Sequence, residues 1–379
     1  MTFEKKFCEY SRTIYSEEFI PLHRPVFKGL EKKYLKECID TNFVSSVGKK
    51  VGDFEDAIIE FTGSKYAIAT MNGTAALHIA MELAGVKQDE EVLTQPLTFI
   101  ATCNAISYTR AKPVFIDVDR DTLGMSPESL EQFLIKNTFT KKSQIFNKKT
   151  KKRISACVPM HTFGFPLRIK EIQRICEEWN IPLIEDSAES LGSFYSGKHT
   201  GTYGMFGIYS FNGNKVITTG GGGMLVTDNK LLAKKAKHIT TTAKKNHPYE
   251  YVHDSVSYNY RLPNINAALG CAQMKQLNKF LKQKKKVAKK WEKFFSENNI
   301  NFIKPIEEAD PNYWLNTIVL KSKKERNNFL DYTNNNNVMT RPVWRLMNKL
   351  EMFKKCQHDG LNNAEWLENR TVNIPSSVP

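Results

Sequence analysis

The chain has no long apolar stretch, although it contains 379 residues. No apolar run approaches the ~20 residues that a helix needs to cross a bilayer. The amino-terminal segment MTFEKKFCEYSRTIYSEEF carries charged residues throughout and has no apolar core, so we expect no signal peptide. These absences predict a soluble, cytoplasmic protein without a membrane partner.

Cysteine and histidine motifs are also missing. The seven cysteines are scattered without CxxC spacing, and their odd number argues for free thiols in a reducing compartment. The eight histidines form no HExxH motif or other ligand pattern, so we expect no metal site. The segment GSFYSGKH at 192–199 nearly matches a P-loop, but His199 lacks the hydroxyl that binds magnesium. We therefore predict a turn and a hairpin there.

Positive charge is in excess, because 55 Lys and Arg residues face 40 Asp and Glu residues, a net charge of +15. This excess is compatible with nucleic-acid binding. The lysines cluster at 141–153, where we predict a surface loop, and at 279–290. Around the second cluster, apolar residues at helical spacing predict a long helix packed on a domain, with lysines on its solvent face. They are Leu277, Phe280, Leu281, Ala288, Trp291 and Phe295. Because no aromatic-basic recognition motif is present, we expect no nucleic-acid partner.

Strand-like and helix-like segments alternate up to about residue 245. YAIAT, EEVLTQP, KPVFIDVD and ISACVPM are typical of strands, and helices are expected between them. The alternation predicts an α/β domain with a mainly parallel sheet between helices. From about residue 246 the pattern changes to a long helix and short strands, which predicts a smaller α+β domain. We therefore divide the chain into a large domain at 1–245, with an amino-terminal helical segment, and a small domain at 246–379.

The most informative segments lie near the middle of the chain. PLIEDSAESLG contains Asp186 at the end of a short apolar run, so this carboxylate is expected at the carboxyl end of a strand, where α/β sheets present their chemistry. FGIYSFNGNKVITTGGGGM contains Ser210 and Lys215, and its glycines allow a flat ligand to approach the lysine. A lysine near a buried carboxylate suits pyridoxal phosphate (PLP), which needs an amine for a Schiff base and an anion beside its pyridine nitrogen. The pair predicts a PLP enzyme.

Two further segments fit this hypothesis. In YAIATMNGTAALHIAMELAG, a strand and a turn at Gly73 and Thr74 lead into a helix whose first N–H groups can bind phosphate. A plain helix cap is the alternative for this turn. In QPLTFIATCNAI, Phe99 starts a helix and could stack on an aromatic cofactor, with a place in the core as the alternative.

Together, NGTAAL, LTFIAT, EDSAESLG and SFNGNK followed by TTGGGG resemble the DegT/StrS-type, PLP-dependent sugar aminotransferases. The resemblance runs from about Ile20 to the end of the chain and implies a fold-type I PLP aminotransferase. It implies that Lys215 binds the cofactor covalently, that Asp186 pairs with the pyridine nitrogen and that Phe99 stacks on the ring. The residues implied for the phosphate are Gly73, Thr74 and Ser210.

The resemblance extends to YNYRLPNINAALG at 258–270, which is similar to the dimer-contact segment of that family. It implies a homodimer with shared active sites, in which Asn259 reaches the phosphate bound by the partner subunit. A hydrogen bond within one chain is the alternative.

Two positions depart from the common family pattern. Glu189 stands where many members have Gln or His, near the 3′-oxygen of the cofactor, and a carboxylate facing that phenolate needs one of the two groups to be protonated. Gly221 replaces the Glu of a GEGG motif. Both variants resemble the branch that aminates UDP-linked 4-keto-6-deoxy-N-acetylhexosamines at C-4, on the routes to bacillosamine and legionaminic acid. The alternatives are a C-3 aminotransferase, a PLP-dependent sugar 3-dehydratase, or a non-catalytic basic regulatory or nucleic-acid-binding protein on this fold.

The substrate contacts are less defined. The resemblance implies an amino-acid donor, L-glutamate, besides the keto sugar. His161 in PMHTFGFP follows a buried strand, so it is either part of the sugar pocket or a structural histidine. Arg341 in MTRPVW has a planar guanidinium that suits a diphosphate or the carboxylate of the donor, with a surface ion pair as the alternative.

Overall fold

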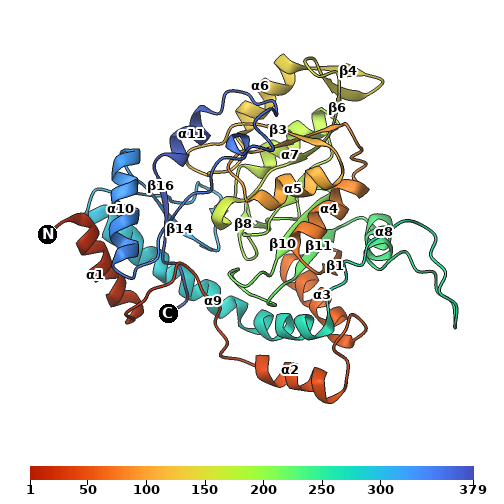
Figure 1. Cartoon of the computed structure of the whole chain (residues 1–379), viewed down its shortest axis with the longest axis horizontal. Coiled ribbons are helices and arrows are strands. Elements are labelled where there is room, and N and C mark those ends of the chain that lie inside the picture. Colours follow the sequence, from red (N-terminus) through yellow and green to blue (C-terminus); the bar gives the residue numbers. More distant parts are fainter.

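The computed structural model describes residues 1–379 and has one mainly parallel sheet at its centre (Figure 1). Its strands are, in spatial order, β1 (Tyr66–Thr70), β11 (Gly223–Thr227), β10 (Phe206–Ser210), β7 (Ile184–Asp186), β6 (Arg153–Val158), β2 (Glu91–Thr94) and β3 (Lys112–Phe115). β7 and β6 are joined by backbone bonds, among them the one from Asp186 N to Pro159 O at 2.9 Å. Of these seven strands, β11 alone runs antiparallel to its neighbours, so the predicted mainly parallel sheet is confirmed.

Helices cover both faces of this sheet. One face carries α4 (Gly73–Leu83), α5 (Ile100–Tyr108) and α8 (Lys230–Thr240), and the other carries α3 (Lys49–Thr62), α6 (Pro127–Asn137) and α7 (Ile169–Glu178). Successive side chains of a strand point to opposite faces. In β1, Ile68 therefore packs in the core under α4, and Ala67 and Ala69 pack in the core under α3.

A smaller antiparallel sheet follows in the carboxyl-terminal part. Its strands are, in order, β12 (Asn301–Phe302), β14 (Asn316–Val319), β16 (Thr371–Ile374) and β15 (Arg341–Pro342). The remaining elements near it are α10 (Lys323–Asn335), α11 (Asn362–Glu368) and the short 3₁₀ helix η2 (Met347–Lys349). This arrangement agrees with the predicted α+β character.

The amino-terminal helix α1 (Phe3–Tyr15) packs with the smaller sheet and not with the large one. Phe7 is buried against Trp291, with ring centroids 5.2 Å apart, and Figure 1 shows α1 beside α10. The expected grouping of this helix with residues 1–245 therefore differs from the packing. The reason is the apolar face of α1, which finds its partners in the carboxyl-terminal part of the chain.

The long helix α9 (Asn264–Glu297) connects the two sheets, and α2 (Glu31–Asp40) packs on it. All six residues of the predicted apolar stripe are buried, so the packed helix is confirmed. We expected the lysines of this helix to lie on its solvent face. Lys284 is an exception, because it lies on the buried face and is 1% exposed. None of the helices combines the length and apolar composition that a membrane span needs.

Two segments form hairpins. The lysine-rich stretch contains β4 (Thr138–Lys141) and β5 (Gln144–Asn147), where we predicted a loop. Phe139 and Phe146 stack across this pair, 5.7 Å apart, and Lys142 and Ser143 adopt the positive φ angles of a tight turn. The P-loop-like segment forms β8 (Phe194–Tyr195) and β9 (Lys198–His199), as predicted, and β13 (Ala309–Asp310) extends it.

Candidate active site

A cavity of about 350 Å³ lies at the carboxyl ends of β7 and β10. It is enclosed by the start of α4, the start of α5 and the loop after β10, which brings Asn212, Asn214 and Lys215 to its wall. The predicted residues that line it are Gly73, Thr74, Phe99, Asp186, Glu189, Ser210 and Lys215. Sequence segments far apart in the chain therefore meet in one place, at the sheet edge where α/β proteins bind ligands.

One end of the cavity is suited to a phosphate. The Asn72 side chain caps α4 by accepting the Ala75 N–H at 2.8 Å, while the N–H groups of Gly73 and Thr74 have no acceptor within the protein. A Cβ on Gly73 would lie 3.1 Å from the Cβ of Ser210, so the absence of a side chain keeps this end open. Free N–H groups at a helix amino terminus, with the hydroxyls of Thr74 and Ser210 beside them, form an anion site.

Asp186 forms the floor of the cavity and is 2% exposed. The Thr102 hydroxyl donates to its Oδ2 at 2.6 Å, and the Ala188 N–H donates to its Oδ1 at 3.2 Å. Burial raises the pKa of this carboxyl, and the bond from Thr102 opposes the rise. A buried carboxylate held in this way is suited to pair with a cationic N–H of a ligand.

Lys215 and Glu189 form an ion pair at the opposite wall, with Nζ 3.2 Å from Oε1. The other oxygen of Glu189 accepts the Phe163 N–H at 2.8 Å. Burial raises the pKa of Glu189 to about 7, although the charge of Lys215 acts in the opposite direction. Near neutral pH this carboxyl is therefore present in both its protonated and its ionised form.

Aromatic rings complete the walls. Phe99 is the N-cap of α5 and remains 48% exposed within the cavity, with the Trp344 ring 5.9 Å away. Gly221 and Gly222 leave the opposite side open to a flat ligand. The cavity thus combines N–H groups that can bind a phosphate, a carboxylate, an amine and an aromatic face. These residues fit PLP.

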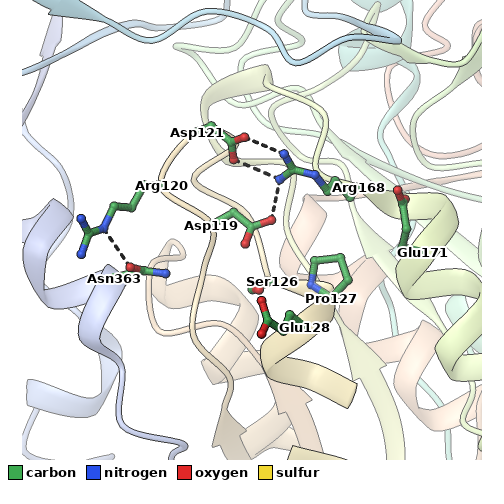
Figure 2. Close-up of a pocket in the computed structure, with 9 residues that line it drawn as sticks. All are labelled: Asp119, Arg120, Asp121, Ser126, Pro127, Glu128, Arg168, Glu171 and Asn363. Atoms are coloured by element: carbon green, nitrogen blue, oxygen red, sulfur yellow. Dashed lines mark hydrogen bonds and ion pairs between the residues drawn. The ribbon is translucent and has the colours of Figure 1, made fainter. Parts of the chain in front are cut away.

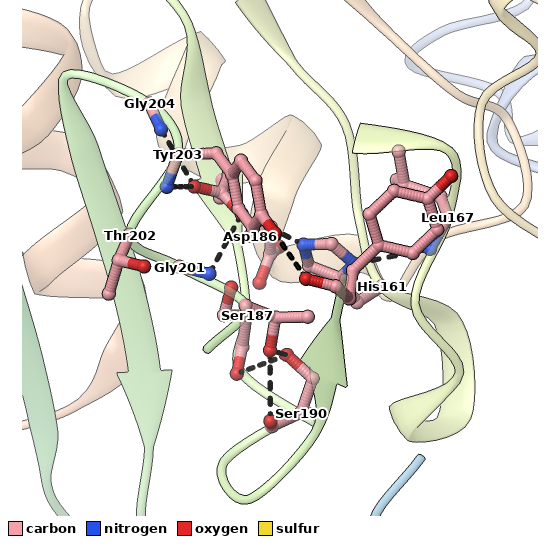
Figure 3. Close-up of polar contacts among 12 residues, drawn as sticks. His161, Leu167, Asp186, Ser187, Ser190, Gly201, Thr202, Tyr203 and Gly204 are labelled. Carbon is pink, nitrogen blue, oxygen red and sulfur yellow. Dashed lines mark hydrogen bonds and ion pairs between the residues drawn. The ribbon is translucent and has the colours of Figure 1, made fainter. Parts of the chain in front are cut away.

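His161 does not line the cavity, because its side chain is 0% exposed. Its Nε2 lies 3.1 Å from the buried Glu185, and its Nδ1 accepts the Leu167 N–H at 3.3 Å (Figure 3). Glu185 also accepts the N–H groups of Gly201, Tyr203 and Gly204 at 2.6–2.8 Å. Of the two interpretations of His161, the structural one is therefore correct, and the place in the sugar pocket is not.

Arg341 and Asn259 also lie outside the lining of this cavity. The exposed Arg341 donates to Asn334 Oδ1 at 2.8 Å and forms no ion pair, so neither predicted use is seen within this chain. The exposed Asn259 accepts a bond from Arg261 Nε at 3.0 Å. The structure of one subunit therefore leaves the predicted role of Asn259 toward a partner untested.

A larger hollow, of about 660 Å³, lies elsewhere on the surface and has no hydrophobic side chain in its lining (Figure 2). Arg168 occupies it and pairs with Asp119 and Asp121 at 2.6 Å each. The guanidinium holds the pKa of Asp121 below its usual value through this bond. The charged groups satisfy one another, so this hollow is a surface ion-pair cluster and not a second candidate active site.

The comparison with protein families follows from these observations. The model of the DegT/DnrJ/EryC1/StrS aminotransferase family matches residues 26–379. The chain belongs to this family. It is therefore a PLP-dependent sugar aminotransferase with the fold-type I architecture, as the sequence motifs predicted.

Named relatives of this aminotransferase point to nucleotide sugars. It is 34% identical to the GDP-perosamine synthase of Escherichia coli O157:H7, with 95% of this chain and 93% of the relative covered. It is 35% identical to EpsN of Bacillus subtilis (strain 168), a putative pyridoxal phosphate-dependent aminotransferase, with coverage of 94% and 90%. The solved structure of Helicobacter pylori PseC, an aminotransferase involved in the biosynthesis of pseudoaminic acid, matches with a TM-score of 0.85 at 22% identity over 94% and 93% of the chains. These relatives support nucleotide-sugar chemistry, but not the UDP-specific branch.

Sequence reasoning missed several residues of the aminotransferase site. Thr102 lies one helical turn after Phe99, so the LTFIAT motif contained a usable signal for it. Trp314 and Trp344 line the cavity from the carboxyl-terminal part of the chain, and no local pattern indicates this. Their place depends on how the small sheet packs on the large one.

Proposed function

We propose that the enzyme transfers an amino group from L-glutamate to C-4 of a UDP-linked 4-keto-6-deoxy-N-acetylhexosamine. The observation on which this proposal depends is the meeting of Lys215 and Asp186 in one cavity with the free N–H groups of α4. A lysine amine, a buried carboxylate and a phosphate site together are the protein groups that PLP chemistry requires.

In this proposal, Gly73, Thr74 and Ser210 bind the phosphate of the cofactor. Asp186 holds a proton on the pyridine nitrogen, and Phe99 packs against one face of the ring. The fixed position of Asp186 supports its role, because Thr102 and the backbone of Ala188 direct its oxygens toward the cavity. When bound, PLP supplies an electron sink for the carbanion formed at the amino-acid Cα.

Lys215 Nζ is the group that moves protons in the proposed reaction. It would remove the proton from the amino-acid Cα and deliver it to the cofactor carbon on the other side of the amino nitrogen, and the same steps would run backwards with the keto sugar. Glu189, 3.2 Å away, exchanges a proton with the amine or with the 3′-oxygen of the cofactor, since its pKa is raised to about 7 by burial. The buried walls limit the access of water to the reacting atoms.

The identity of the sugar is supported by the variants Glu189 and Gly221, which resemble the UDP-specific branch. A GDP-linked keto sugar is the second candidate, because three of the relatives are named GDP-perosamine synthase. Incubation with UDP-, GDP- and TDP-linked 4-keto sugars and glutamate, read by mass spectrometry, distinguishes them. Turnover only with a GDP-sugar rejects the first candidate.

The regiochemistry is tested on the same product by NMR. We expect nitrogen on C-4. Nitrogen on C-3, or loss of water without gain of nitrogen, would instead indicate the C-3 aminotransferase or the 3-dehydratase.

We further propose that the enzyme is a homodimer with shared sites. Residues 241–258 form an arm that projects from the molecule (Figure 1), and it exposes Tyr249 and Tyr251 at 80% each and Val256 at 96%. Large apolar side chains are rarely left in water in such a row, so a protein surface is the expected partner. The projecting arm supports the proposal that Asn259 reaches the phosphate end of the cavity in the partner subunit.

Complementation tests the shared site. In a heterodimer of Lys215→Ala and Asn259→Ala subunits, one site carries both defects and the other carries neither. We therefore expect activity to return in part after subunit exchange. Absence of recovery despite proven exchange, with Asn259→Ala itself impaired, would contradict sharing.

A further inference from the structure

Trp314 lies against the amine of Lys215. The Nζ atom is 4.1 Å from the centroid of the indole ring, and Glu189 is its ion-pair partner at 3.2 Å. Trp314 is 4% exposed and lines the cavity. We propose that Trp314, anchored by Lys284, is a positioning residue for Lys215; this inference rests on the proposed role of Lys215.

Three hydrogen bonds hold Trp314, one through its ring and two through its backbone. Its ring N–H donates to the carbonyl of Asn214, the residue before Lys215, at 2.6 Å. The backbone N–H of Trp314 donates to Asn312 Oδ1 at 2.7 Å, and its carbonyl accepts from Lys284 Nζ at 3.2 Å. Trp314 is therefore bonded through its ring to the loop that carries Lys215, and through its backbone carbonyl to α9.

Lys284 is the unusual member of this set. It occupies a core-facing position of α9, forms no ion pair, and donates to the carbonyls of Trp314 and Ser376, the latter at 2.6 Å. Burial lowers the pKa of Lys284 to about 7. Two carbonyl acceptors match the two hydrogens of a neutral amine, so the side chain bridges Trp314 and the carboxyl-terminal segment without a counter-ion.

The consequence concerns the freedom of Lys215. A lysine side chain has four rotatable bonds, and an ion pair on one side leaves much of its motion unrestricted. The face of an indole attracts an ammonium through its ring quadrupole and also blocks the rotamers that would cross it. Trp314 and Glu189 together hold Nζ where the aldehyde carbon of the cofactor has to meet it.

The test separates placement of the amine from integrity of the cavity. The full chain, freed of cofactor, is mixed with PLP, and the adduct on Lys215 is trapped with borohydride and quantified by mass spectrometry against time. Binding of pyridoxamine phosphate is measured in parallel by fluorescence. That ligand has the same ring and phosphate but forms no bond with a lysine, so it reports the cavity alone.

For Trp314→Leu we expect trapping to slow roughly ten-fold, with the affinity for pyridoxamine phosphate changed less than about two-fold. Trp314→Phe keeps an aromatic face and should recover part of the rate. Lys284→Met should slow trapping about three-fold, because Trp314 keeps its ring N–H bond to Asn214 and its backbone bond to Asn312. Controls are Lys286→Met on the exposed side of α9 and Trp366→Leu, an indole that faces Arg120 and Arg370 away from the cavity; both should match wild type.

Trapping at the wild-type rate in Trp314→Leu overturns the inference, and so does a parallel loss of pyridoxamine phosphate binding, which would mean a collapsed cavity. If Trp314→Leu does not fold, the Trp314→Phe and Lys284→Met variants test the inference in its place. Wild-type trapping rates in both variants overturn the inference. Failure of the wild-type chain to form an adduct on Lys215 would instead reject the proposed function.

Discussion

Two hollows of this surface differ in how their charges are satisfied. The hollow around Arg168 is the larger, but its guanidinium is shared between Asp119 and Asp121, and all three side chains are partly exposed (Figure 2). The smaller cavity holds Asp186 and Glu189 almost fully buried, with one lysine between the phosphate end and the aromatic wall.

The difference shows why size alone does not locate a site. Exposed ion pairs are screened by water and contribute little energy, and they do not exclude solvent. Burial in the smaller cavity raises the pKa of both Asp186 and Glu189, which places proton exchange near neutral pH at Glu189. The N–H groups of Gly73 and Thr74, which have no acceptor within the protein, lie at this cavity, where a ligand is expected.

The largest effect is expected for Lys215→Ala, which should abolish turnover because no other amine lines the cavity. The measurement is amino transfer to a keto sugar, together with borohydride trapping of PLP. Lys286→Ala, on the exposed side of α9, serves as the control and should be unaffected. A normal rate or a trapped adduct in Lys215→Ala would show that the wrong amine has been assigned.

Asp186→Asn should lower kcat by about 100-fold while some cofactor is retained. The amide keeps the shape and one hydrogen bond, but it has no charge to hold a proton on the pyridine nitrogen. Absorbance gives the bound cofactor and steady-state kinetics give kcat. An unchanged kcat at full cofactor occupancy would rule out an electrostatic role for Asp186.

Glu189→Gln tests the buried carboxyl through stability and pH. In the folded, cofactor-free protein the pKa of Glu189 is raised by burial from 4.5 to about 7, so the native state keeps a proton that the unfolded chain loses. This contribution is fully present below about pH 4.5 and is lost as pH rises through about 7. Relative to Glu189→Gln, the wild type should therefore lose up to about 3 kcal/mol of unfolding free energy between pH 4.5 and pH 8.

Urea unfolding of both proteins at several pH values measures this difference. Titratable groups far from Glu189 contribute equally to the two proteins, so their titrations cancel. A difference that stays constant from pH 4.5 to pH 8 would contradict the raised pKa.

Arg168→Gln should have the smallest effect, since it removes only a partly exposed ion-pair cluster. We expect a loss of about 1 kcal/mol in unfolding free energy and kcat within about two-fold of wild type. A ten-fold loss of kcat with stability unchanged would make the larger hollow part of the functional site and reverse the comparison.

Local sequence patterns predicted much of this molecule. The apolar runs before Asp186 and before the turn at Gly73 marked strand ends, and parallel strand ends meet at one edge, so the meeting of Asp186 and Gly73 followed from the pattern. The stripe on α9 gave the buried face of that helix. Lys284 has the helical spacing of this stripe. The prediction that it is exposed, made because it is a lysine, was wrong.

Other features could not be predicted from local sequence patterns. β16 pairs in the middle of the small sheet, although its residues are nearly the last of the chain. The burial of His161 depends on Glu185 and on the turn at Gly201, Tyr203 and Gly204. Such pairings join residues with no fixed spacing, so no periodicity signals them.

The sequence by itself determined the alternation of strands and helices, the phosphate-type turn into α4 and the lysine before the glycines. These depend on backbone preferences and on apolar spacing within a few residues. Only the tertiary structure decided that Thr102 holds Asp186, that Glu189 meets Lys215, and that Trp314 reaches the lysine from the other end of the chain. Those contacts are set by the packing of one layer on another, and the raised pKa of Glu189 exists only because that packing removes water from around it.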